Sequence, residues 1–179
     1  MAVKTFTSEV LTSGDVNTYL TNAMAQYVTS VTVGTGVSSV NVPSAFSTTY
    51  DNYLVVYSGG VGSATHNLRF QLGSATTSYY GGGNYANAAA AAGAVGDSNT
   101  STFRYTGGGD TYGTMMTATV LSPYLAKATY LNAVINTGTS FGNYTGRYYP
   151  TDSFTTFTIS PDSGTLTGGT ITVYGYRKA

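Results

Sequence analysis

The chain has 179 residues, which is enough for one domain with a buried core, and no proline-rich linker or charge run indicates a second large domain. Charged residues make up 8% of the sequence and the formal net charge is zero, so the seven Lys and Arg residues are too few to form the basic surface that nucleic acid or an anionic membrane requires. Cysteine is absent, which excludes disulfide bonds and thiolate metal sites.

The expected location follows from hydropathy and charge. The first residues, MAVKTFTSEVL, lack the apolar region of a signal peptide, and no segment approaches the roughly 20 apolar residues of a membrane span. We therefore expect a chain that is made in the cytoplasm, is not exported by that route and is not inserted in a membrane. Near-zero net charge favours association, so we expect the protein to be part of an assembly.

A helical pattern opens the chain. Apolar residues recur there at spacings of four, four and three, the period of an amphipathic helix, and a capping pattern precedes them. The helix is expected to begin near Ser13 and to end before Val31. Either it packs on its own domain or it is an attachment and oligomerisation element. The residues of its apolar stripe are Val16, Leu20, Met24 and Tyr27. The expected division is an attachment segment, 1–30, and a β domain, 31–179.

The rest of the chain has a period of two. In HNLRFQLG, Leu68, Phe70 and Leu72 are expected to face inward, and Arg69 and Gln71 to face water. The same alternation returns in NYLVVYSG, GTMMTATVLS, ATYLNAVINT, NYTGRYY, FTTFTIS and GTITVYGYR. Eight or so short strands separated by turn residues predict an all-β fold, an antiparallel β-sandwich or a barrel.

Two connections have a composition of their own. SPDSGTLTGG contains Pro161, Asp162 and Gly164, which favour a turn, so it is predicted to join the last two long strands as a hairpin. The apolar residues of those strands would then share one face: Phe157, Ile159, Ile171 and Val173. The Gly- and Ala-rich segment 78–101 is predicted to be a long surface loop with at most one helical turn.

Catalytic patterns are missing from the sequence. The seven acidic residues stand mostly in turn-like surroundings with no close pair, and His66 is the single histidine. No serine lies in a G-x-S-x-G elbow, and the glycine-rich segments lack the GK[ST] ending of a phosphate loop. We therefore expect no catalytic residue, no cofactor and no metal site, and a protein that is not an enzyme.

Tyrosine is unusually abundant, with 17 residues and no tryptophan. Tyrosine beside Ser, Gly and Asn is typical of adaptable binding surfaces, but it also packs well on strands. We expect strand tyrosines such as Tyr53 and Tyr57 to serve packing. The candidates for surface recognition are Tyr79, Tyr80, Tyr85 and Tyr112.

Three segments resemble virion structural proteins of tailed bacteriophages, of the short tail-fibre, tail-tip or head-appendage type. They are FTSEVLTSGDVNTYLTNAM near the start, FSTTYDNYLVVYSGG followed by LRFQLG, and the closing FTISPDSGTLTGGTITVYGYRK. The resemblance covers about half of the chain, and no shaft, collagen-like repeat or sustained heptad accompanies it.

The resemblance implies a jelly-roll-like sandwich with one N-terminal α-helix, usually trimeric, in a virion fibre, tip or knob that contacts other virion proteins and the host surface. A capsid decoration or cement protein is the first alternative. A module that binds host polysaccharide is the second, which makes a host-surface glycan a further candidate partner.

Overall fold

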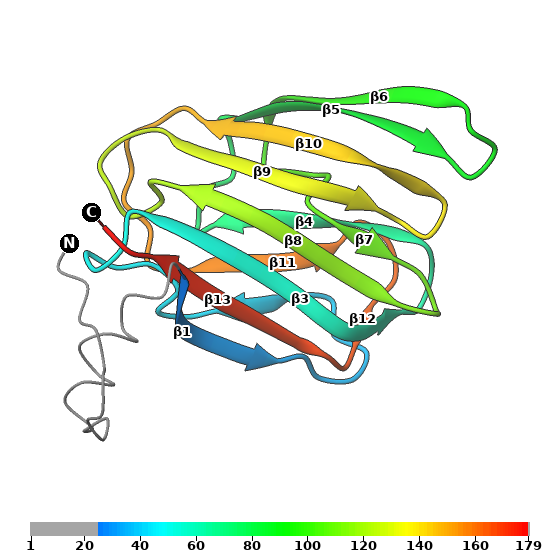
Figure 1. Cartoon of the computed structure of the whole chain (residues 1–179), viewed down its shortest axis with the longest axis horizontal. Coiled ribbons are helices and arrows are strands. Elements are labelled where there is room, and N and C mark those ends of the chain that lie inside the picture. Colours follow the sequence, from blue (N-terminus) through cyan, green and yellow to red (C-terminus); the bar gives the residue numbers. More distant parts are fainter. Residues whose placement is uncertain (1–24, 179) are drawn as a thin grey trace, which may run out of the picture.

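The computed structural model describes residues 25–178 and contains thirteen β-strands and, within that range, no helix (Figure 1). The strands are β1 (Ala25–Thr32), β2 (Val40–Val42), β3 (Asn52–Gly62), β4 (His66–Leu72), β5 (Tyr79–Asn87), β6 (Ala92–Thr100), β7 (Gly108–Gly109), β8 (Thr114–Leu121), β9 (Thr129–Asn136), β10 (Ser140–Tyr148), β11 (Phe157–Pro161), β12 (Leu166–Thr167) and β13 (Thr170–Tyr176). Every strand pairing is antiparallel, so the expected all-β antiparallel fold is confirmed.

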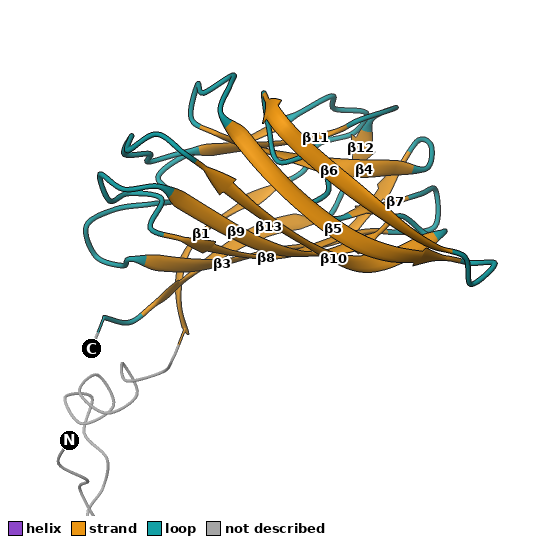
Figure 2. Cartoon of the chain, turned by 90° about the horizontal axis from the view of Figure 1, so that it is seen from above, coloured by secondary structure: helices purple, strands orange, loops and turns teal. Residues whose placement is uncertain are grey.

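The strands form a long group and a short group. The long group has the order β1-β13-β3-β8-β9-β10-β5-β6, and the short group has the order β2-β11-β4. The two-residue strand β7 pairs with β4 and with β8 and so joins the two groups. Figure 2 shows the long group as one curved layer, and β4 and β11 lie on one side of that layer.

Aromatic side chains fill the space between the two groups. Phe46, in the loop after β2, lies 4.8 Å from Tyr53 of the long group and 5.6 Å from Phe157 of the short group, measured between ring centroids. Phe157 in turn stacks on Phe70, with centroids 4.5 Å apart. All four side chains are buried, so the core lies between the two strand groups and holds them together.

The alternation in the two clearest segments is confirmed. Leu68, Phe70 and Leu72 are fully buried, whereas Arg69 and Gln71 between them are half-buried. The strand tyrosines Tyr53 and Tyr57 of β3 are also fully buried, as expected for packing residues. The sequence of a strand with one covered face therefore shows which of its side chains are buried.

The predicted N-terminal helix is wrong over its last part. Residues 25–30 belong to β1, which pairs with β13 from Ala25 opposite Tyr176 to Thr32 opposite Thr170. Tyr27 is therefore an exposed strand residue, and the boundary expected between residues 30 and 31 falls inside β1. Pairing with β13 satisfies the backbone of a segment rich in Val and Thr, which favours a strand. Val16, Leu20 and Met24 lie outside the described residues.

The predicted closing hairpin is also wrong. β11 pairs with β2 and β4, whereas β13 pairs with β1 and β3, so residues 162–169 cross from the short group to the long group. The apolar residues expected to share one face are all buried, but they belong to two different groups: Phe157, Ile159, Ile171 and Val173. Gly164 does have a positive φ, of 70°, as expected for a turn residue, whereas Pro161 is the last residue of β11 rather than part of a turn.

The segment 78–101 is not a loop but the β5–β6 hairpin at one margin of the long group. Its tip is short and is organised by Asn87, whose side-chain oxygen accepts hydrogen bonds from the backbone N–H groups of Ala89 and Ala91. Ala90 there has a φ of 60°. Four of the five alanines therefore form the turn between β5 and β6, and the fifth, Ala92, is the first residue of β6.

Glycines in these strands make room for tyrosine rings. A Cβ atom placed on Gly81 would lie 2.2 Å from the hydroxyl oxygen of Tyr144, and one on Gly93 would lie 2.6 Å from the Tyr85 ring. The rings lie across the neighbouring strand and cover the backbone that a glycine leaves bare. The combination of many glycines and many tyrosines, which suggested loops in the sequence, is therefore a packing device of the sheet.

Candidate ligand-binding cleft

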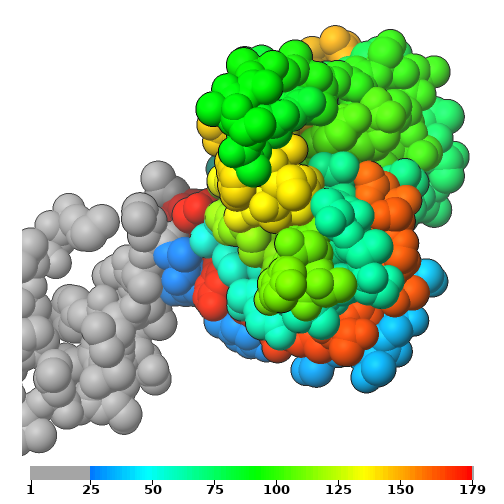
Figure 3. Space-filling view, turned by 90° about the vertical axis from the view of Figure 1, so that its right-hand side faces the viewer, coloured from blue at the N-terminus to red at the C-terminus, as the bar shows by residue number. Residues whose placement is uncertain are grey.

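A cleft of about 420 Å³ opens at the end of the molecule that lies opposite the first and last described residues. In Figure 1 the chain leaves β13 at one end, while the β5–β6 tip and the β9–β10 turn lie at the other. Figure 3 looks at this second end, where the green β5–β6 hairpin and the yellow β9–β10 turn lie beside the teal start of β4 and the orange segment after β11. Strands from both groups therefore form the walls of the cleft.

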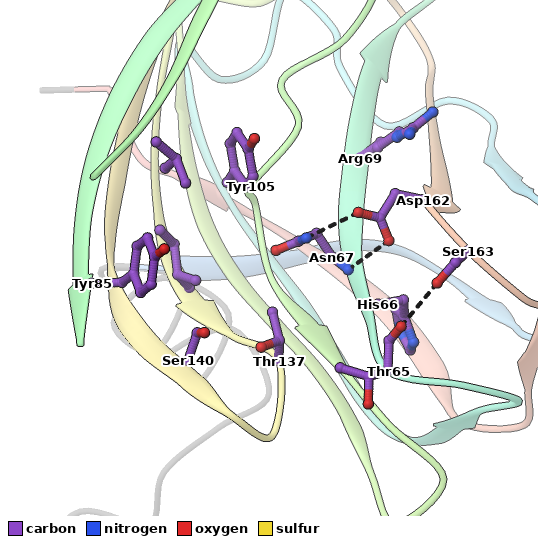
Figure 4. A pocket seen from close by; sticks show the side chains of 12 residues that line it. Thr65, His66, Asn67, Arg69, Tyr85, Tyr105, Thr137, Ser140, Asp162 and Ser163 are labelled. Carbon is purple, nitrogen blue, oxygen red and sulfur yellow. Dashed lines mark hydrogen bonds between the residues drawn. The ribbon is translucent and has the colours of Figure 1, made fainter. Parts of the chain in front are cut away.

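Tyr85 of β5 forms one wall (Figure 4). Its strand partners are Gly142 on β10 and Gly93 on β6, so no side chain stands beside it on either neighbouring strand. The ring lies against Gly93, where an added Cβ would collide with it. Val95 and Ile135 continue this apolar side of the cleft. The aromatic face is thus held by the sheet and left uncovered.

Tyr105 stands on the same side of Figure 4, and a buried carboxylate fixes its segment. Asp97 of β6 accepts hydrogen bonds from the Tyr144 hydroxyl at 2.6 Å and from the backbone N–H of Arg104 at 3.1 Å, and it forms an ion pair with the Arg104 side chain. The guanidinium lies 5.3 Å from the Tyr105 ring centroid. Asp97 is only 7% exposed, so the segment that carries Tyr105 is anchored from inside the fold.

The opposite wall is polar and connects β4 with the segment after β11. Asp162 accepts a hydrogen bond from the Asn67 backbone N–H and another from the Asn67 side-chain amide, each at 2.9 Å. Ser163 donates to the Thr65 carbonyl at 2.8 Å. Figure 4 shows both links on the side of the cleft that faces Tyr85 and Tyr105. The polar groups are thus pre-positioned by bonds between residues far apart in sequence.

Arg69 lines the cleft beside this wall. Its Nε atom is buried and has no hydrogen-bond partner among the described residues. A buried donor without an acceptor costs free energy.

The single histidine has a local role. His66, the first residue of β4, is 2% exposed, and its Nδ1 lies 2.8 Å from the Ala64 carbonyl oxygen. Among residues 25–178 no three His, Asp or Glu side chains come together as a metal site would require. In the same range no helix is long and apolar enough to cross a membrane.

The four surface candidates lie in different surroundings. Tyr79 is fully buried between Phe103 and Tyr148 and is therefore not a surface residue. Tyr80 is exposed on the outer face of the sheet, and Tyr112 is 94% exposed on the turn after β7. Only Tyr85 reaches the cleft. Sequence reasoning missed Asn67, Arg69, Tyr105 and Asp162, because their proximity depends on the crossing of the chain between the two groups.

Four buried tyrosines make the fold sensitive to alkali. Burial raises the pKa of the hydroxyls of Tyr57, Tyr79 and Tyr144, with a further contribution from Asp97 at Tyr144. Burial and then the hydrogen bond to Asp152 raise the pKa of Tyr148 to about 12. The folded state thus favours the neutral hydroxyls, so their stabilisation is complete below the unfolded pKa of about 10 and is lost as the pH rises through the folded values.

We therefore expect the urea midpoint to hold up to about pH 10 and to fall steeply toward about pH 12. The measurement is urea unfolding followed by near-UV circular dichroism across that range. Tyr148→Phe removes one titrating hydroxyl and should make the decline less steep. A midpoint that stays constant to pH 12 would show that these hydroxyls ionise without opposition from the fold.

The outer face of the long group has almost no charge. Its eight strands contain two charged residues, Asp97, which is buried, and Arg147. The Arg147 guanidinium lies 4.1 Å from the centroid of the Tyr149 ring and 5.3 Å from that of Tyr130. The exposed large side chains on and beside these strands are Tyr27, Tyr80, Tyr130, Val134, Phe141 and Tyr149. A face with little charge and several exposed aromatic residues is typical of a surface that associates.

Comparisons with known proteins leave the family open. No protein-family model matches the sequence, and no curated protein matches it. Among solved structures, the baseplate tripod (BppUct-A-L) of bacteriophage Tuc2009 has 12% identity to this chain and a TM-score of 0.24, over 99% of this chain and 78% of that one. A structure of infectious bursal disease virus, Gx strain, has 8% identity and a TM-score of 0.12, over 86% of this chain and 39% of that one. At these TM-scores neither likeness establishes a shared fold.

Proposed function

We propose that the chain is a non-enzymatic structural protein of a tailed-bacteriophage virion, located in the tail or in a tail-linked appendage and assembled as a homo-oligomer, most simply a trimer. In this proposal the two strand groups form a jelly-roll-like sandwich. The segment before β1 attaches the protein to other virion proteins, and the opposite end is displayed toward the host.

The observation that carries the proposal is the polarity of the fold. Ala25 and Tyr176 are paired neighbours on β1 and β13, so the described chain begins and ends at one end of the molecule. The cleft and the turns around it lie at the other end. A module that is attached through one end and offers a shaped, largely uncharged surface at the other suits an appendage.

The placement of the resembling segments also supports it. NYLVVYSGG forms most of β3 and pairs with β13, which contains ITVYGY, while LRFQL of β4 pairs with FTISP of β11. Segments separated by about a hundred residues thus pair in both strand groups. The resemblance therefore involves strands that pair with one another rather than scattered turns.

Oligomerisation is supported by the outer face of the long group. That face has a single charged side chain, Arg147, which is covered by Tyr149 and Tyr130. Two such faces would bring together few charges, and the guanidinium that each contributes already lies against aromatic rings.

Two alternatives remain. A capsid decoration protein would have the same composition and fold and would differ in its position in the particle, which imaging of labelled particles would establish. A polysaccharide-processing enzyme would need two carboxylates about 5–10 Å apart, whereas Asp162 is the one carboxylate that lines the cleft among the described residues. Sustained turnover of a host polysaccharide would contradict the non-enzymatic assignment.

The attachment role predicts the effect of Leu20→Asp. An unpaired carboxylate in an apolar contact is strongly unfavourable, so the variant should no longer enter particles and should lose its oligomeric mass. Its thermal melt should remain within a few degrees of the parent. The measurements are particle incorporation by complementation, native mass spectrometry and differential scanning calorimetry.

Thr18→Asp is the matched control, because it adds the same charge to the same segment on the side opposite the predicted apolar stripe. It should assemble normally. A collapsed melt for Leu20→Asp would mean that the segment belongs to the core, and normal incorporation would mean that it has no role in attachment.

A further inference from the structure

We propose that the cleft is a binding site for a neutral saccharide, with a sugar ring held between Tyr85 and the wall formed by Asn67 and Asp162. This inference rests on the proposed function in one respect, since it names the partner of the displayed end. The binding chemistry of the cleft itself does not depend on the proposed function.

The cleft has the two-sided chemistry that a sugar ring requires. One side presents aromatic and aliphatic surface from Tyr85, Tyr105 and Val95, against which the C–H face of a pyranose can pack. The other side presents the amide of Asn67 and the carboxylate of Asp162, which can pair with ring hydroxyls. Thr137 and Ser140 add hydroxyl groups at the lower margin in Figure 4.

The charges favour a neutral ligand. Of the Lys, Arg, Asp and Glu side chains among the described residues, Arg69 and Asp162 line the cleft, and their charges are opposite. A phosphorylated or strongly acidic ligand would need an excess of cations, as sites for such groups do. A sugar hydroxyl needs only a donor or an acceptor, and the side chains of Asn67 and Asp162 supply both.

The size favours a short piece of a glycan. About 420 Å³ is near the lower limit of the roughly 300–1,000 Å³ typical of small-ligand sites. The cleft is open at the surface, so a longer chain could continue beyond it. We therefore expect one or two sugar rings inside and the remainder outside.

The walls are largely ordered before any ligand binds. The Tyr85 ring lies against Gly93, Asp97 anchors the segment of Tyr105, and Asp162 holds Asn67. Binding a ligand to groups already in position costs less conformational entropy. The lower entropy cost is important for a saccharide, because its individual contacts with a protein are weak.

The test uses the full chain and a panel of neutral di- and trisaccharides of glucose, galactose, N-acetylglucosamine and rhamnose, with sialyllactose as the anionic comparator. Saturation-transfer NMR identifies binders, and titration followed by amide shifts gives the affinity. At least one neutral sugar should bind and shift amides of residues 65–69, 85 and 162. Tyr85→Ala should weaken binding at least about tenfold through loss of the stacking surface.

Two further variants separate the site from the fold. Gly93→Val removes no polar group but pushes the Tyr85 ring from its place, so it should also weaken binding. Tyr112→Ala removes a tyrosine that is 94% exposed and outside the cleft, so it should bind as the parent does. Each variant must first show a parental melt.

The outcomes are distinct. Absence of binding by every neutral sugar, preference for sialyllactose, or unchanged affinity in Tyr85→Ala would overturn the saccharide site. None of these results would touch the virion proposal if the chain still enters particles. Conversely, neutral-sugar binding by a chain that never enters particles would support the site and contradict the proposed function.

Discussion

Phe70→Ala should lower the free energy of unfolding by about 3–5 kcal/mol, the usual cost of truncating a buried phenylalanine to alanine. Its ring is fully buried and stacks on Phe157, with centroids 4.5 Å apart and ring planes 12° apart. Its backbone also bridges to Phe103, so the surroundings are held from two sides and cannot easily close the cavity. A single domain of ordinary stability has a free energy of unfolding of about 5–15 kcal/mol, so such a loss can approach the whole of it.

The control is Arg69→Ala, one position along the same strand. Arg69 is half-buried on the opposite face of β4, so its loss should change stability by much less than that of Phe70. Chemical denaturation of both variants in parallel gives the comparison. If Arg69→Ala were the more damaging of the two, the register of β4 against β11 would have to be shifted by one residue.

Local periodicity was enough for the strands but not for their partners. The buried face of β4 can be predicted because the alternation of apolar and polar side chains is contained within its seven consecutive residues. The predicted closing hairpin is wrong because β11 and β13 pair with strands from distant parts of the chain. The residues of SPDSGTLTGG do not specify those partners. Turn residues specify a reversal of direction, and they do not specify which sheet the next strand joins.

Composition misled most in the segment 78–101. Glycines there suggested a loop, whereas Gly81 and Gly93 are strand residues covered by the rings of Tyr144 and Tyr85. Such a pairing of a glycine on one strand with an aromatic residue on the next depends on register, which the segment alone does not contain. The N-terminal pattern is a second case, because residues 25–30 form a strand through pairing with β13, a partner that the local sequence does not specify.

The fate of the candidate tyrosines shows why the site was only partly predictable. Tyr79 and Tyr85 lie on the same face of β5, at positions of equal parity. Tyr79 is covered by Phe103 and Tyr148, and Tyr85 is not, since the aromatic cover ends before it reaches that part of the strand. Strand alternation gives the face of a residue, but only the extent of the opposite layer decides between core and cleft.

Asp97→Ala is expected to be the second strongly destabilising substitution. Asp97 accepts hydrogen bonds from the Tyr144 hydroxyl and from the Arg104 backbone N–H. Both donors would lose their acceptor, at about 1–3 kcal/mol for each group left buried and unsatisfied. The Arg104 side chain, 39% exposed, can turn to water instead, so the loss should come mainly from the buried Tyr144 hydroxyl and the part-buried Arg104 N–H.

Asp152→Ala is a matched control, because Asp152 accepts the Tyr148 hydroxyl at the same 2.6 Å but is exposed, so water can replace it. Urea unfolding should show a large loss for Asp97→Ala and a small one for Asp152→Ala. Since Asp97 also fixes the segment of Tyr105, its variant should lose affinity for the saccharide under conditions where it is still folded, and Asp152→Ala should not. Equal losses of stability in the two variants would mean that the buried carboxylate contributes no more than a surface hydrogen bond.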